Sequence, residues 1–189
     1  MDHAGCAAAI TAGGQSRRYG SDKALARFEG QTLLERVALS LAWASPRLLV
    51  APPGRYRLAG WQATGDLRPG QGPLAGLEAA LSAAPDGWLA FAAVDLPHLT
   101  PGYWRTLTEQ RQPGALAVCG QDEAGRSQPL AALYHTSALP VVRRLLDAEE
   151  RRMSALLEQL PTIQLPWATL AFCGPQLYRN ANRPEDLLG

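Results

Sequence analysis

The chain has 189 residues, enough to bury one hydrophobic core and too few for two ordinary domains, so we expect a single domain over residues 1–189. Hydrophobic residues make up 47% of the chain and charged residues 19%, which is typical of folded proteins and excludes a disordered chain. The formal net charge of +1 lacks the basic excess of general nucleic-acid or membrane-surface binders.

Targeting and metal-binding patterns are also missing from the sequence. The first residues lack the basic and apolar regions of a signal peptide, and no apolar run is long enough to span a bilayer. The three cysteines lie far apart without a C-x-x-C pair, which predicts neither a zinc site nor a disulfide framework. We therefore expect a cytoplasmic protein with reduced thiols, and no membrane or nucleic-acid partner.

The first predicted element is a buried strand over residues 7–11, followed by a glycine-rich, basic loop. Gly13 and Gly14 allow a sharp turn and bring backbone N–H groups close to a ligand. Cationic side chains follow in the same loop, namely Arg17, Arg18 and Lys23. Amide donors and cations that converge after a first strand are suited to a polyphosphate. The loop matches neither the Walker A motif nor the dinucleotide fingerprint G-x-G-x-x-G.

Apolar runs and turn residues predict alternating strands and helices along the rest of the chain. Residues 24–28 fit a short extended stretch, Thr32 and Glu35 have the spacing of a capping box, and Ser137 fits a helix cap. Asn182 is a candidate cap for a last short helix. Further strands are predicted over 48–51, 88–94, 115–119, 129–134 and 162–165, and helices with apolar faces over 34–41, 74–81, 103–107, 139–146 and 153–160.

This alternation predicts an α/β fold with a mostly parallel sheet covered by helices on both faces. Ligands of such sheets bind beyond the carboxyl ends of the strands. The glycine-rich loop, Asp66, the loop at Gly72 and Asp95 all occupy such positions in the predicted fold.

Asp95 is the first candidate for metal binding, because it follows seven consecutive apolar residues, 88–94. A carboxylate is a poor core residue but a good oxygen ligand for Mg²⁺. A strand-end cap is the structural alternative at this position. Two further segments fit a nucleotide or a polar ring: Gly72 and Pro73, which open a helix, and Asn180 with Asn182, two amides two residues apart. Plain helix entry and a helix cap are the alternatives for these two segments.

The motifs together resemble a known family. A-G-G-x-S-x-R-x-G-x-D-K, G-P-L-A-G, V-D-L-P, Q-P-L-A-A-L-Y, E-R-R and N-A-N-x-P-E-D-L run in order from Thr11 to Leu187. The first motif is shared by many nucleotidyltransferases, whereas G-P-L-A-G and the asparagine pair resemble the molybdenum cofactor guanylyltransferases, the MobA family. The resemblance implies a three-layer, Rossmann-like nucleotidyltransferase fold and the transfer of GMP from GTP to the terminal phosphate of Mo-molybdopterin, with release of pyrophosphate.

The resemblance also implies roles for individual residues. Residues that the resemblance implies to contact the guanine nucleotide are Thr11, Ala12, Gly13, Lys23, Asp66 and Asp95, and Asp95 would also hold Mg²⁺. Gly14, Gly72 and Pro73 join this set because their backbone allows a nucleotide to approach closely. Residues matched to the pterin substrate are Arg18, Asn180 and Asn182. Arg18, Lys23 and Asp95 form the implied catalytic set, with no side-chain nucleophile. Thr11 stands where the family commonly has leucine, and Ala51 where some members have an asparagine that contacts the nucleotide.

Other functions stay open at this point. The same fold serves cytidylyl transfer to molybdopterin and the activation of sugar phosphates, and a non-catalytic nucleotide-binding module would share the first loop. Retention of Lys23 and Asp95 favours an enzyme. The expected partners are GTP and Mo-molybdopterin as substrates, with transient contact to proteins that insert the cofactor.

Overall fold

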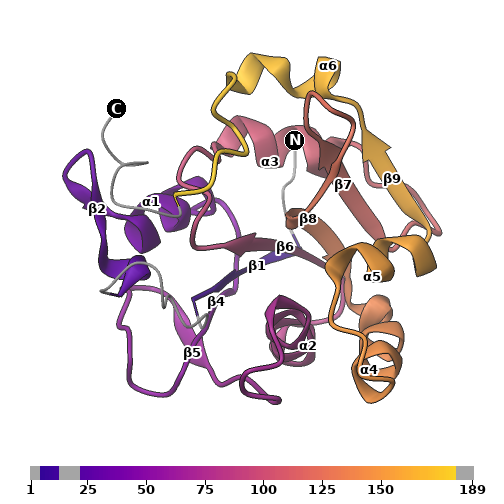
Figure 1. The fold of residues 1–189 in the computed structure, drawn as a ribbon, viewed down its shortest axis with the longest axis horizontal. Coiled ribbons are helices and arrows are strands. Elements are labelled where there is room, and N and C mark those ends of the chain that lie inside the picture. Colours follow the sequence, from indigo (N-terminus) through magenta and orange to yellow (C-terminus); the bar gives the residue numbers. More distant parts are fainter. Residues whose placement is uncertain (1–4, 13–21, 182–189) are drawn as a thin grey trace.

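A seven-stranded sheet forms the centre of the molecule (Figure 1), and the computed structural model describes residues 5–12 and 22–181. Its strand order is β5-β4-β1-β6-β8-β7-β9, and all neighbours pair in parallel except β8, which runs antiparallel to β6 and β7. The strands are β1 (Cys6–Thr11), β4 (Arg47–Val50), β5 (Gln62–Thr64), β6 (Trp88–Ala93), β7 (Ala117–Gln121), β8 (Ser127–His135) and β9 (Thr162–Leu165), and a separate small hairpin consists of β2 (Arg27–Phe28) and β3 (Gln31–Thr32). The predicted mostly parallel α/β sheet is confirmed.

Helices cover both faces of this sheet (Figure 1). The helices α1 and α3, followed by the short α6, pack on one face, and α2, α4 and α5 pack on the other. The α-helices are α1 (Leu33–Ser40), α2 (Pro73–Ala83), α3 (Pro101–Glu109), α4 (Leu139–Asp147), α5 (Met153–Gln159) and α6 (Trp167–Leu170), and the 3-10 turns are η1 (Lys23–Leu25), η2 (Thr136–Ala138) and η3 (Ala171–Cys173).

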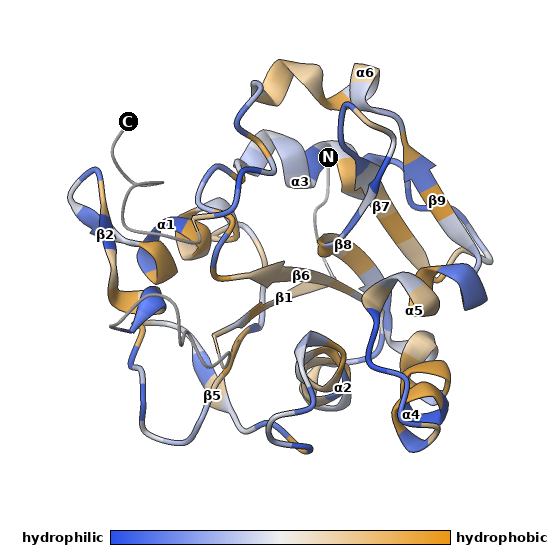
Figure 2. Cartoon of the chain, viewed as in Figure 1, coloured by the Kyte–Doolittle hydropathy of each residue, from blue (hydrophilic) through white to orange (hydrophobic). Residues whose placement is uncertain are grey.

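The strands β1 and β6 are hydrophobic along almost their whole length because both of their faces are buried (Figure 2). In β1, Ala8 and Ile10 face the helices α1 and α3, whereas Ala7 and Ala9 face α2 and α4. A strand buried on both sides has no polar face to alternate with, so it appears in the sequence as a continuous apolar run.

The capping box at the start of α1 is confirmed. The Thr32 hydroxyl accepts a hydrogen bond from the Glu35 N–H at 3.1 Å, and the Glu35 carboxylate accepts one from the Thr32 N–H at 2.8 Å. These two bonds satisfy amide donors that the first turn of a helix otherwise leaves without partners.

Two of the local predictions were wrong. Residues 24–28 are not one extended stretch, because Asp22 caps the turn η1 before the chain extends into β2. Ser137 does not cap the following helix: it lies inside η2, whose cap is His135, and its N–H donates to the ring Nδ1 of His135 at 3.3 Å. Helix α4 then begins at Leu139 without a side-chain cap.

Candidate functional site

Four parallel strands bring their carboxyl ends to one edge of the sheet, and most of the predicted site residues follow them. Ala12 comes after β1, Ala51 after β4, Asp66 after β5 and Asp95 after β6. Backbone hydrogen bonds continue past the strand ends, from the Val94 N–H to the carbonyl of β1 at 3.2 Å. The edge is therefore a rigid platform on which loop residues can be placed.

The structure brings Asp95 and Lys23 together at this edge. The Lys23 ammonium lies 3.1 Å from the Asp95 Oδ2, and the two side chains are only 24% and 13% exposed, for Asp95 and Lys23 respectively. The second oxygen of the carboxylate, Oδ1, is buried and accepts no hydrogen bond within the described part of the chain. A buried carboxylate oxygen without a partner is costly unless a ligand satisfies it.

The residues predicted to contact the nucleotide from α2 also lie at this edge. Gly72 precedes α2 with a φ of 82°, a conformation that favours glycine, and Pro73 is the first residue of the helix. One turn later, Gly76 lies against Thr11, so that a Cβ at position 76 would come within 2.8 Å of the Thr11 Oγ1. The small residues of G-P-L-A-G thus let the helix approach the end of β1 closely.

We expect Gly76→Val to destabilise the protein by about 1–3 kcal/mol, because the added side chain must displace Thr11 or move the helix. Urea unfolding of the variant measures this loss. Thr11→Ala in the same chain removes the Oγ1 atom and should restore part of the stability. An unchanged midpoint for Gly76→Val alone would contradict the close approach.

Asp66 occupies the outer end of the same edge. Its Oδ1 accepts a hydrogen bond from the Arg68 N–H at 2.9 Å, and the Arg68 side chain pairs with Glu78 on α2 at 2.9 Å and with Asp147 on α4 at 2.7 Å. The strand order places β5 three spacings from β6, roughly 14 Å. The strands that precede Asp66 and Asp95 are therefore separated by the ends of β4 and β1.

The segment near the carboxyl terminus returns to the same place. The Ala181 N–H donates to the Asp95 carbonyl at 3.0 Å, and the methyl group of Ala181 is buried with Phe28 and Leu33. Asn180, next to this anchor, is exposed. The contact brings Asn180, the first asparagine of the predicted motif, beside the turn that carries Asp95.

Several predicted residues lie outside the described part of the chain. These are Gly13, Gly14, Arg17, Arg18, Asn182 and the expected last helix. Their roles stay predictions from the sequence.

Two arginines, Arg36 and Arg179, lie near the turn after Asp95, and Arg36 is paired with Glu29 at 2.7 Å. The Arg36 Nε donates to the Pro97 carbonyl at 3.2 Å, and its guanidinium lies 4.7 Å from the centre of the Phe28 ring. Burial, and after it the charges of Arg36 and Arg179, lower the pKa of His98. His98 is therefore mostly neutral near pH 7, and the cationic side chains near it are those of the two arginines.

The sequence reasoning missed the contacts that hold the Lys23 segment. Asp22, the neighbour of Lys23, accepts hydrogen bonds from Tyr56 and Arg55, which lie between β4 and β5. The D-K pair of the first motif marked Asp22, but nothing in the pattern of residues 51–61 indicated its partners.

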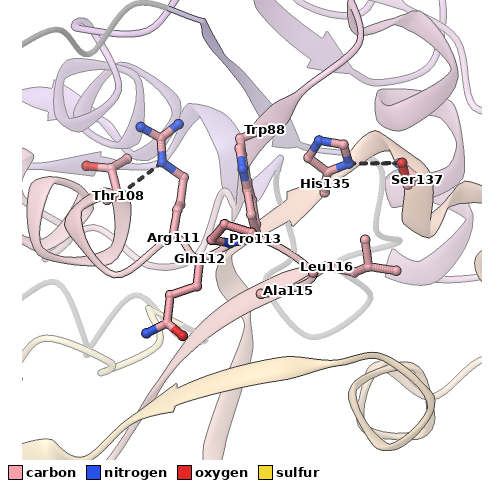
Figure 3. A pocket seen from close by; sticks show the side chains of 10 residues that line it. Trp88, Thr108, Arg111, Gln112, Pro113, Ala115, Leu116, His135 and Ser137 are labelled. Carbon is pink, nitrogen blue, oxygen red and sulfur yellow. Dashed lines mark hydrogen bonds between the residues drawn. The ribbon is translucent and has the colours of Figure 1, made fainter.

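An open pocket of about 600 Å³ lies at the opposite edge of the sheet, lined among others by Trp88, Arg111, His135 and Ser137 (Figure 3). Its polar groups are engaged locally: the Arg111 Nε donates to the Thr108 carbonyl at 2.9 Å, and the ring of His135 contacts the Ser137 hydroxyl at 3.1 Å. The start of β6, not its end, forms this pocket, so it is not part of the site around Asp95.

Within residues 5–12 and 22–181, no three acidic, histidine or cysteine side chains gather as a preformed metal centre. No described helix has the length and apolarity that crossing a bilayer requires.

Comparison with known proteins identifies the family to which the chain belongs. The model of the MobA-like NTP transferase domain matches residues 8–163, which is most of the chain. The chain belongs to this family. The predicted family and the nucleotidyltransferase fold are thereby confirmed.

Relatives within the family extend over nearly the whole chain. A protein of Deinococcus radiodurans named probable molybdenum cofactor guanylyltransferase is 49% identical over 95% of this chain and 91% of its own length. The crystal structure of molybdopterin-guanine dinucleotide biosynthesis protein A from Archaeoglobus fulgidus has a TM-score of 0.78 at 27% identity, covering 96% of this chain and 95% of that one. A cytidylyltransferase from Thermus thermophilus, at 17% identity and a TM-score of 0.70, shares the fold.

Proposed function

We propose that this protein transfers GMP from GTP to Mo-molybdopterin, forming the guanine dinucleotide cofactor and pyrophosphate. The observation that carries the proposal is the Lys23–Asp95 pair at the carboxyl end of the central strands, within a chain 49% identical to a guanylyltransferase. A terminal phosphate oxygen of the acceptor would attack the α-phosphorus of GTP. The bond between the α- and β-phosphates would break, and pyrophosphate would leave.

The residues at the sheet edge suit a bound nucleotide. Thr11 and Ala12 lie at the end of β1, and the start of α2 at Gly72 and Pro73 would let a base or ribose approach the backbone. Asp66 at the outer end would contact the far part of the same nucleotide. Lys23 would hold phosphate oxygens and offset the charge that develops on pyrophosphate, together with Gly13, Gly14 and Arg18 of the loop.

Asp95 fits a divalent cation. Its Oδ1 is buried and without a hydrogen-bond partner among the described residues, and a carboxylate oxygen is the ligand that Mg²⁺ prefers. Mg²⁺ commonly uses one or two protein carboxylates and completes its shell with water and substrate phosphates, so a single aspartate is sufficient. When bound there, Mg²⁺ would screen the repulsion between two anionic substrates.

Two arginines lie where we place the anionic acceptor: Arg36, which is paired with Glu29 at 2.7 Å, and Arg179. Arg36 and Arg179 lie close enough to His98 to influence its pKa, and Asn180 lies next to the Ala181 anchor. The exposed amide of Asn180, with Asn182, would bind the polar edge of the pterin. In this proposed arrangement the Asp95 carboxylate would lie between the nucleotide and the acceptor.

Pyrophosphate release in the presence of Mg²⁺ and Mo-molybdopterin tests the proposal, with GTP, CTP, ATP and UTP compared at equal concentration. We expect release with GTP and none above background with the other nucleotides. Release with CTP alone would reassign the protein to cytidylyl transfer. Tight binding of Mg·GTP without release would leave a non-catalytic nucleotide-binding module. Omission of Mg²⁺ is the control for the metal requirement.

A further inference from the structure

The chain segment that carries Lys23 is too short to hold its own position. The turn η1 has three residues, Lys23–Leu25, and one 3-10 turn has little stability by itself. Asp22 begins this turn: its Oδ1 accepts a hydrogen bond from the Ala24 N–H at 3.2 Å, and its carbonyl accepts one from Leu25 at 3.0 Å. The orientation of Asp22 therefore determines the position of the Lys23 backbone, from which the Lys23 side chain extends.

Two residues from the distant β4–β5 connection hold Asp22. The Tyr56 hydroxyl donates to its Oδ1 at 2.6 Å, and the Arg55 Nε donates to its Oδ2 at 2.9 Å. Tyr56 is buried, and the Arg55 guanidinium lies 5.5 Å from the centre of the Tyr56 ring. Both carboxylate oxygens are thus engaged, which restricts rotation of the side chain about its own axis.

The charge of Asp22 is maintained by these partners. Burial acts to raise the pKa of this carboxyl, but the hydrogen bonds from Tyr56 and Arg55 outweigh burial, and its pKa lies below the usual value. The carboxylate is ionised throughout the neutral range. Both of its hydrogen bonds from the β4–β5 connection are therefore charge-assisted, the stronger kind.

We propose that Asp22, Arg55 and Tyr56 are positioning residues, which hold the Lys23 ammonium at the end of β6, where it would meet the phosphates of the nucleotide. This inference rests on the proposed function, because it assigns to Lys23 a contact with the nucleotide. It adds that two residues of the β4–β5 connection, 33 and 34 positions from Asp22 in the sequence, contribute to the affinity of the phosphate site. Lys23 is thus constrained in two ways: Asp22 bonds to the N–H groups of Ala24 and Leu25, which follow it in the turn, and Asp95 lies 3.1 Å from its Nζ.

Calorimetric titration of Mg·GTP into the full chain tests this inference, in the parent and in a Lys23→Met background. We expect Asp22→Asn, which removes the charge from both contacts, to raise Kd about tenfold. Tyr56→Phe removes one of the two charge-assisted hydrogen bonds and should raise Kd about fivefold. In the Lys23→Met background both changes should alter Kd less than twofold, because residues that act through one another are not additive. Arg57→Gln, an exposed arginine of the same connection, is the matched control and should leave Kd unchanged.

Thermal unfolding of each variant separates positioning from loss of fold. Tyr56→Phe keeps the buried ring, and Arg55→Gln alters only an exposed side chain, so these variants serve where Asp22→Asn unfolds. Equal increases of Kd in both backgrounds would overturn the positioning role. The same holds if Lys23→Met binds Mg·GTP more weakly than the parent while Asp22→Asn binds it with an unchanged Kd. If Lys23→Met bound Mg·GTP with the Kd of the parent, the nucleotide contact assigned to Lys23 in the proposed function would be contradicted. The positioning role, which depends on that contact, would then be wrong as well.

Discussion

Asp95→Asn is expected to lower the turnover number of pyrophosphate release by about 10²-fold to 10³-fold while the protein stays folded. The amide has the shape of the carboxylate but is a much poorer ligand for Mg²⁺, and it no longer neutralises Lys23 at 3.1 Å. Steady-state rates at saturating GTP and acceptor measure the loss, and circular dichroism establishes that the fold persists.

Asp86→Asn is the matched control for this substitution. Asp86 is exposed near the start of β6, at the edge of the sheet opposite Asp95, and it accepts a hydrogen bond from the Thr136 hydroxyl at 2.7 Å. Its replacement should leave turnover within about twofold of the parent, because Asp86 is exposed and lies at the end of β6 opposite the proposed site. Near-normal turnover in Asp95→Asn would remove Asp95 from the catalytic set.

Trp104→Ala is expected to reduce the free energy of unfolding by about 3–5 kcal/mol, the usual cost of deleting a large buried aromatic side chain. Trp104 is fully buried in α3, and its ring Nε1 donates to the Ser40 Oγ of α1 at 3.1 Å. The residue therefore joins the two helices that cover one face of the sheet. Urea unfolding followed by circular dichroism measures the change.

Two milder variants separate the packing of Trp104 from its hydrogen bond. Trp104→Phe keeps an aromatic ring and should cost less than the alanine variant, whereas Ser40→Ala removes only the acceptor and should cost about 1 kcal/mol. A loss below 1 kcal/mol for Trp104→Ala would mean that α3 contributes little to the core.

The parts of the fold that the sequence predicted are those with a local cause. Continuous apolar runs predicted β1 and β6, because a strand buried on both faces has no polar positions. Thr32 and Glu35 predicted the start of α1, because both partners of a capping box lie within one turn.

The missed parts depend on distant contacts. The three residues of β5 are polar or small and mostly exposed, so no hydrophobic pattern marked them, and α6 has only four residues. That β8 enters between β6 and β7 in the opposite direction is a property of strand pairing, which periodicity does not encode. His135 displaced Ser137 as a cap because the chain forms a 3-10 turn first.

The same distinction between local patterns and distant contacts applies to the candidate site. The motif around Lys23 and the strand end at Asp95 predicted both residues, and the structure places them 3.1 Å apart. Tyr56 and Arg55 have no such signal, since an arginine and a tyrosine in a polar loop resemble ordinary surface residues until the loop is folded against Asp22. The anchor at Ala181 is a backbone hydrogen bond, to which side-chain identity contributes only its small size.

The two outer strands of the sheet have a consequence for the behaviour of the protein in concentrated solution. An unpaired strand edge can add a strand from another molecule and so start aggregation. Here β5 has three residues, and β9 has four between Pro161 and Pro166, two residues that cannot donate a backbone hydrogen bond. On β9, the Gln164 side chain also accepts hydrogen bonds from Gln121 at 2.6 Å and Ser127 at 3.1 Å. The two outer strands therefore offer a neighbouring molecule few backbone hydrogen-bonding groups with which to extend the sheet.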